Sequence, residues 1–147
     1  MKATANTKYG RFFGCVNGTN WNSAPNVVMQ YEQYYNGTLN LLWGNTTSSA
    51  TPSITGDYND HIYDLNQGVI SRDGTQVYDF NDTDTWNVPY NLAIFTYMKS
   101  NGPTTNSDEW FKGKLYWFKI WDDDVLVRDF IPVRVNGVGY LYDKVSG

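Results

Sequence analysis

Residues 115–132 read Leu115-Tyr-Trp-Phe-Lys-Ile-Trp121, then Asp122-Asp-Asp124, then Val125-Leu-Val-Arg-Asp-Phe-Ile-Pro132. Two runs of β-branched, aromatic and aliphatic residues flank a short acidic turn, so each run can satisfy its backbone groups by pairing with the other. The pattern predicts a β-hairpin.

Side chains alternate across a strand, which divides the first run into two faces. These faces carry Tyr116, Phe118 and Ile120 on one side, and Trp117, Lys119 and Trp121 on the other. Because a lysine interrupts the second face, we expect that face to meet solvent and to expose both tryptophans. The first face, together with Phe12 and Leu141, is expected in the core.

Similar runs recur along the chain, each bounded by turn-forming residues. The predicted strands span 11–16, 27–34, 38–43, 61–66, 69–72, 76–80, 90–97, 114–121, 125–132 and 139–143. Asn36-Gly37 and Asp73-Gly74 are the strongest hairpin turns, and Gln67-Gly68 and Asn136-Gly137 give weaker signals of the same kind. So many short strands without a helical pattern predict an all-β fold, a two-sheet antiparallel β-sandwich of the jelly-roll type.

Composition sets limits on function. The 147 residues suit one domain spanning 1–147, with aromatic residues at 17% and charged residues at 18%. A net charge of −4, with no cluster of Lys and Arg, argues against a nucleic-acid partner. No apolar run is long enough to span a membrane, so we expect no membrane insertion.

Catalysis and metal binding find little support in the sequence. Glycoside hydrolysis normally needs two carboxylates at a defined separation, and the two glutamates, Glu32 and Glu109, show no such pairing, with Glu109 expected at a solvated loop end. We therefore expect no catalytic residues and no enzyme activity. Loop aspartates could ligate Ca²⁺, but no spacing matches a known calcium loop, so no cofactor and no metal ligands are assigned. Those aspartates are Asp57, Asp60, Asp79, Asp82, Asp84 and Asp122–Asp124.

The six tryptophans carry the functional hypothesis. They cannot all occupy the core of a chain this size, because indole N–H groups need hydrogen-bond partners. Exposed indoles stack on the C–H faces of sugar rings, while amides and carboxylates bond to the hydroxyls. The stacking candidates are Trp43, Trp86, Trp110, Trp117 and Trp121, and the hydrogen-bonding candidates are Asn45, Asp84 and Asn87.

Several segments together resemble a known class of domain. The closing strands Gly113-Lys-Leu-Tyr-Trp-Phe-Lys-Ile-Trp121, Leu126-Val-Arg-Asp-Phe-Ile-Pro132 and Gly139-Tyr-Leu-Tyr-Asp143 are similar to those of concanavalin A-like, laminin-G-like jelly-roll domains. Tyr9-Gly-Arg-Phe-Phe-Gly14, the Asp73-Gly74 hairpin and Asn91-Leu-Ala-Ile-Phe95 extend the resemblance over most of the chain. Such domains occur in tail and fibre proteins of phages of gut bacteria, and in surface or secreted proteins of their hosts.

The resemblance implies an extracellular, cell-surface or virion location, and it leaves two functions open. The first is a non-catalytic, lectin-like domain that binds a glycan through exposed aromatics and polar loop residues. The alternative is a structural or assembly domain of a phage or cell-surface particle with no small ligand. Related domains carry further residues at both ends, so we expect a domain excised from a longer chain, or one completed by a partner or by homo-oligomerisation.

Overall fold

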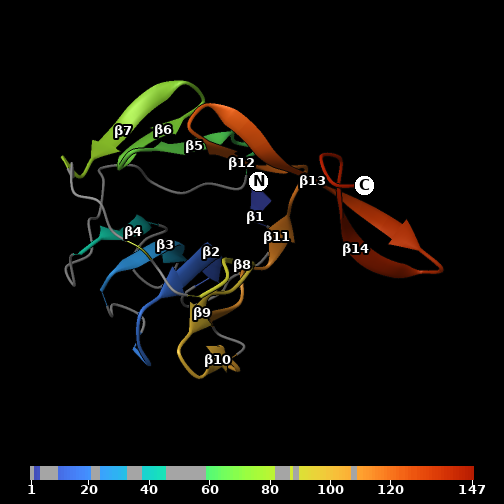
Figure 1. Cartoon of the computed structure of the whole chain (residues 1–147), viewed down its shortest axis with the longest axis horizontal. Helices are drawn as coiled ribbons and strands as arrows, with labels where there is room; N and C mark the ends of the chain where they lie inside the picture. Colours follow the sequence, from blue (N-terminus) through green and yellow to red (C-terminus); the bar gives the residue numbers. More distant parts are fainter. Residues whose placement is uncertain are drawn as a thin grey trace.

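The computed structural model describes residues 2–3, 10–20, 24–32, 38–45, 59–81, 87, 90–106 and 109–147. Within these ranges the chain forms fourteen β-strands and no α-helix, so the predicted all-β class is confirmed. The strands lie in two layers, one above the other in the view of Figure 1. The β-sandwich expected from the sequence is therefore the observed architecture.

The lower layer is one six-stranded sheet. Its strands run in the order β10-β9-β2-β3-β4, with β8 paired to β2. The bounds are β2 (Gly10–Val16), β3 (Asn26–Glu32), β4 (Thr38–Gly44), β8 (Ala93–Ile94), β9 (Met98–Lys99) and β10 (Gly102–Pro103). Antiparallel pairing of β3 with β4 agrees with the hairpin predicted at Asn36-Gly37, although that turn itself lies outside the described residues.

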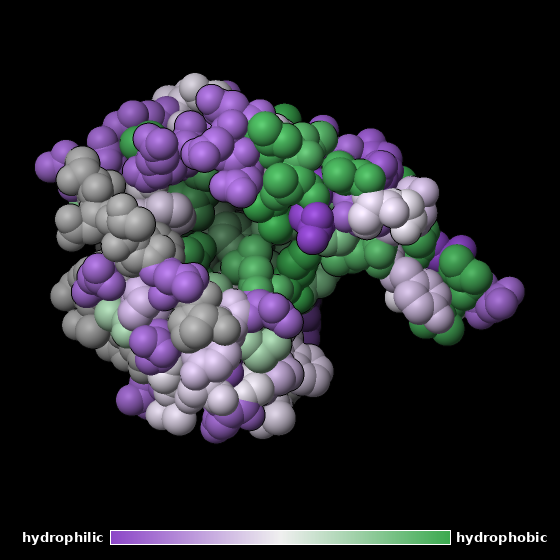
Figure 2. All heavy atoms as spheres, viewed as in Figure 1, coloured by the Kyte–Doolittle hydropathy of each residue, from purple (hydrophilic) through white to green (hydrophobic). Residues whose placement is uncertain are grey.

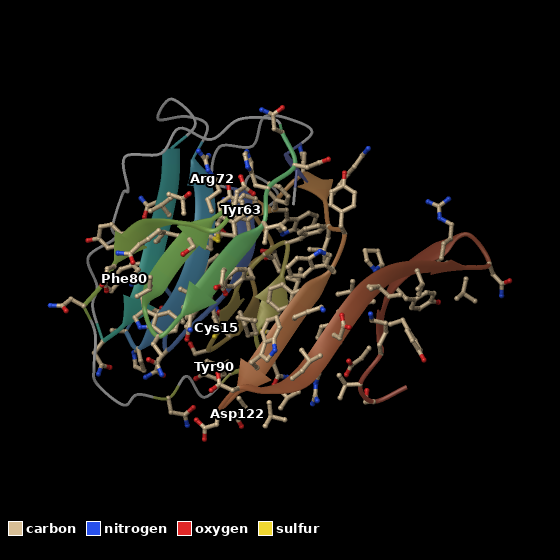
Figure 3. The ribbon with its side chains drawn as sticks, turned by 90° about the horizontal axis from the view of Figure 1, so that it is seen from above. Cys15, Tyr63, Arg72, Phe80, Tyr90 and Asp122 are labelled. Carbon is tan, nitrogen blue, oxygen red and sulfur yellow. The ribbon has the colours of Figure 1, made fainter. Side chains whose placement is uncertain are left out.

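The upper layer holds two three-stranded sheets, β5-β6-β7 and β12-β13-β14. A short pair, β1 with β11, completes the described strands. The bounds are β1 (Lys2–Ala3), β5 (Tyr63–Asn66), β6 (Val69–Arg72), β7 (Thr75–Asp79), β11 (Gly113–Lys114), β12 (Phe118–Asp122), β13 (Val125–Val135) and β14 (Val138–Asp143). Seen from above, β5, β6 and β7 cross over the strands of the lower sheet (Figure 3).

The core fills the space between these layers. Its buried residues are Phe12, Phe13, Met29, Leu41, Ile70 and Phe111. The register of β2 against β3 shifts between Arg11 and Phe13, and this bulge lets two consecutive residues, Phe12 and Phe13, join the same core. Phe12 is thereby confirmed as a core residue.

A second buried cluster lies on the other face of the lower sheet. It contains Val16, Val28, Leu42 and Tyr97. Gly14 lies beneath it, where an added Cβ would approach Val27 O to 2.9 Å and Tyr97 Cβ to 3.1 Å. Tyr97 can pack this close to the sheet because residue 14 has no side chain.

The tight hairpin turns follow the predicted chemistry. Asp73 and Gly74 have φ of 53° and 78°, and the weaker signal at Gln67-Gly68 forms a turn with the same signs. Asn136 and Gly137, with φ of 51° and 83°, close the β13–β14 hairpin. Two successive positive φ values are the signature of type I′ turns, which match the twist of paired strands.

The predicted strand at 90–97 is wrong over most of its length, since only Ala93–Ile94 is a strand. Phe95 has a positive φ of 65°, which turns the chain out of the extended conformation. The Phe95 N–H donates to Phe12 O at 2.8 Å, and Phe95 O accepts from the Phe111 N–H at 3.0 Å. This turn therefore links β2 to the segment that follows β10.

Tyr116 is not in the core, contrary to prediction. It is 48% exposed, and its hydroxyl donates to Asp60 Oδ1 at 3.0 Å. Phe118 pairs with Phe130. Hydrogen-bonded pairs recur every second residue in an antiparallel ladder, so the next one would set Tyr116 opposite Pro132. Because proline has no N–H to donate, the ladder stops at Phe118 and the strand predicted at 114–121 is broken.

Leu141 is also exposed, at 41%, where the sequence predicted burial. It pairs with Pro132 in a stretch of β13 and β14 that we call the projecting hairpin (residues 132–142). Figures 1 and 3 both show this hairpin extending past the end of the lower layer. No described strand of the lower layer lies beneath this hairpin, and alternation alone cannot bury either of its faces.

Candidate functional site

Two exposed tryptophans lie at β12, Trp117 directly before the strand and Trp121 within it. Trp117 is 39% and Trp121 51% exposed, while the alternate residues Phe118 and Ile120 are partly buried. Phe118 packs against Phe13 with ring centroids 5.5 Å apart, which fixes the inner face of the strand. The predicted exposure of both indoles is confirmed.

Lys119 lies between these tryptophans and joins a small charge network. Its Nζ lies 5.8 Å from the Trp117 ring centre and 3.8 Å from Asp129 Oδ2. Lys144 Nζ approaches the same carboxylate oxygen at 2.7 Å. We call Trp117, Lys119, Trp121, Asp129 and Lys144 the indole face.

A β-bulge creates this arrangement. Asp122 pairs with Val125, so a regular ladder would set Lys119 opposite Arg128, but the register shifts between Ile120 and Trp121. Lys119 consequently pairs with Asp129, and a repulsive neighbour is replaced by an attractive one. The sequence did not predict that Asp129 and Lys144 belong to this face, because no residue pattern indicates the register shift.

Asp143 fixes the segment that carries Lys144. Its carboxylate accepts hydrogen bonds from Asp129 N–H at 2.9 Å, Val145 N–H at 3.1 Å and the Ser146 hydroxyl at 2.8 Å. These bonds stabilise the ionised form, led by the one from Asp129, and they hold the pKa of Asp143 below its usual 3.8. Lys144 therefore projects from a segment tied to β13.

Trp110 lies at a different place, beside a buried ion pair. It is 45% exposed and forms a parallel bridge with Arg11 of β2, and its indole N–H donates to Thr104 O at 3.1 Å. Next to it, Arg11 Nη1 lies 3.3 Å from Glu109 Oε1, with side-chain exposures of 2% and 16%. The expectation of a solvated Glu109 is therefore wrong.

Tyr97 and Thr104 complete this second cluster. The Thr104 hydroxyl donates to Glu109 Oε2, and the Arg11 guanidinium lies 4.6 Å from the Tyr97 ring centre. Burial is the main reason that the pKa of the Tyr97 hydroxyl is raised. These contacts all occur within the protein, so the cluster holds residues 97–106 and 109–111 against the lower sheet.

Among the described residues, Trp43, Asn45 and Trp110 lie away from the indole face. Trp43 is half-buried against the β5–β6 turn, where a Cβ at Gly68 would lie 3.1 Å from its Nε1. Asn45, which follows β4, is exposed, and so is Asn87. Trp86 and Asp84 lie outside the described residues. The structure thus groups Trp117 with Trp121 and leaves Trp43, Asn45 and Trp110 with the lower sheet.

Among the described residues, no three His, Cys, Asp or Glu side chains are close enough to hold a metal ion. In the same ranges, no helix has the length and apolar character needed to cross a membrane.

No protein-family model, curated protein or solved structure matches this chain.

Proposed function

We propose that this domain binds a glycan on the indole face and has no catalytic activity. The observation that carries the proposal is the pair of exposed indoles on either side of Lys119. Four residues along an extended chain cover about 13 Å, which is longer than a single sugar ring. The two indoles can therefore stack on different units of one oligosaccharide.

The charged groups between the indoles supply the polar half of the interaction. Lys119 and Lys144 both contact Asp129, and the Lys119 ammonium lies 5.8 Å from the Trp117 ring centre, so ordering these side chains on binding costs little further entropy. Each ammonium has three N–H donors and can bond a ring hydroxyl in addition to the carboxylate. Resemblance to concanavalin A-like jelly-roll domains of surface and virion proteins supports the same proposal and an extracellular setting.

A non-catalytic role agrees with the position of Glu109. Its carboxylate is occupied by Arg11 and Thr104 in a mostly buried cluster. Reducing-sugar assays on xylan, β-glucan and bacterial capsule should show no release. Release that is lost on Glu32→Gln or Glu109→Gln would contradict the proposal.

A glycan array followed by tryptophan-fluorescence titration tests the binding site. Trp117→Ala and Trp121→Ala should each weaken binding by about tenfold, which corresponds to about 1.4 kcal/mol per ring. Trp110→Ala is the matched control, because the 45% exposure of Trp110 falls between those of Trp117 and Trp121 while the residue lies beside Arg11. Equal losses in all three variants would argue against the indole face as the site.

A second function, assembly with neighbouring subunits, is favoured by a separate observation. Six apolar residues at or near the projecting hairpin are 41–55% exposed. They are Val135, Val138, Tyr140, Leu141, Tyr142 and Val145. Figure 2 shows hydrophobic residues along the upper layer near β12 and β13, and again on this hairpin. Exposed apolar patches of this kind mark interaction surfaces.

A further inference from the structure

We infer that the open edge of β14 pairs with the same edge of a second copy of this chain. The inference rests on the assembly role proposed above and names its partner. Among the described residues, β14 pairs only with β13, and no other described strand lies along its outer edge. An unpaired edge is a template for strand addition.

The direction of the backbone groups follows from the hairpin register. Asn136-Gly137 is a two-residue turn, so Val135 and Val138 form a hydrogen-bonded pair. By alternation, the N–H and C=O groups of Gly139 and Leu141 point away from β13. Pro132 is consistent with this pattern, because it lies opposite Leu141 at a pair that needs no N–H from it.

The edge also lacks the usual features that prevent strand addition. Residues 138–142 read Val-Gly-Tyr-Leu-Tyr, with no charge and no proline. Natural sheets normally protect an exposed edge with lysine, proline, a bulge or a covering segment. The register of β13 with β14 is continuous, so no bulge twists this edge away.

A second copy fits this edge by symmetry. A strand that pairs antiparallel with its own copy is related to it by a two-fold axis, and each chain then contributes the same groups. Two three-stranded sheets would join into one of six strands, a common size for a sheet. The contact pairs the β14 edges of both copies with each other, so neither edge remains free to bind a third copy.

The side chains along this edge also suit a dimer. An edge-to-edge contact covers the outward backbone groups of Gly139 and Leu141, and it sets Val138, Tyr140 and Tyr142, each about half exposed, beside apolar side chains of the second copy. The hairpin is also preformed, because Asp143 ties the end of β14 to Asp129 and to residues 145–146. Little order has to be created on binding.

Sedimentation velocity over a concentration series tests this pairing. The wild-type chain should pass from monomer to dimer and stop there. Leu141→Pro removes one outward N–H without touching the β13–β14 ladder, and it should raise the dimer dissociation constant at least tenfold above that of Leu141→Ala. Tyr140→Lys alters only an exposed side chain, and we expect a similar loss from the added charges.

Circular dichroism checks that each variant keeps the fold. A wild-type chain that stays monomeric throughout would overturn both this inference and the assembly role. A dimer unaffected by Leu141→Pro and Tyr140→Lys would overturn the β14 edge alone. Growth into open-ended oligomers would also contradict a closed two-fold contact.

Discussion

The lower sheet and the projecting hairpin contain similar residues but differ in what covers them. Leu41 on β4 is 1% exposed and Leu141 on β14 is 41% exposed, although both lie on antiparallel strands. Leu41 packs between the two layers, whereas Leu141 lies where the upper layer extends past the lower one. Apolar alternation therefore predicts a strand, and only a second layer makes one of its faces a core.

Replacing these two leucines gives the largest expected contrast. Leu41→Ala should lower the free energy of unfolding by about 3 kcal/mol, because it removes buried methyl groups and leaves a cavity. Leu141→Ala, in dilute solution, should cost well under 1 kcal/mol, since that side chain gains little on folding. Urea denaturation followed by tryptophan fluorescence measures both, and equal losses would contradict the difference in packing.

The reaction rate of a thiol should also differ between the lower sheet and the projecting hairpin. Cys15 is 4% exposed, and burial raises the pKa of its thiol from 9.0 to about 11. At a pH below both values, its thiolate fraction should be about 100-fold lower than that of an ordinary thiol. A disulfide reagent should therefore modify native Cys15 slowly and unfolded Cys15 quickly.

Val138→Cys places a comparison thiol on the projecting hairpin, where the native side chain is 53% exposed. The thiol of this cysteine should react with the disulfide reagent as fast as a cysteine thiol in the unfolded chain. Fast modification of Cys15 in the native wild type would show that β2 opens locally.

Removing an ion pair should also cost more stability in the lower sheet than at the projecting hairpin, although the difference is smaller than for the two leucines. Glu109→Gln removes the negative charge that lies 3.3 Å from the buried Arg11 guanidinium, and the expected loss of stability is about 2 kcal/mol. Arg128→Ala breaks an exposed contact with Asp143 of 3.7 Å near the hairpin base, and should cost less than about 1 kcal/mol. Denaturation midpoints compare the two variants, and a larger loss for Arg128→Ala would reverse the ranking.

The smallest predicted effect is a pH dependence at the hairpin base. The folded-state pKa of Asp143 is below 3.8, so its contribution to stability is fully present well above that pH. It is lost as the pH falls through the lower folded-state value and the carboxylate takes up a proton. Asp143→Asn should flatten the acid limb of the curve of stability against pH, and Ser146→Ala should do so in part. An unchanged acid limb in Asp143→Asn would contradict this assignment.

Much of the local structure was predictable from the sequence because it depends on near neighbours. Asp73-Gly74, Gln67-Gly68 and Asn136-Gly137 form the predicted turns, since few other residues tolerate two positive φ values. Alternation placed Trp117 and Trp121 at the surface. In contrast, Phe95 left the extended conformation because its backbone bonds Phe12 and Phe111, which are distant in the chain.

The sequence by itself determined the β class, the turns and the exposure of Trp117 and Trp121, because period-two alternation and turn chemistry act over a few residues. Only the tertiary structure decided which strands were covered, where the bulge paired Lys119 with Asp129, and that Glu109 joined Arg11 in the interior. Those outcomes depend on long-range register and on the extent of the opposing layer. No pattern along a single strand encodes either.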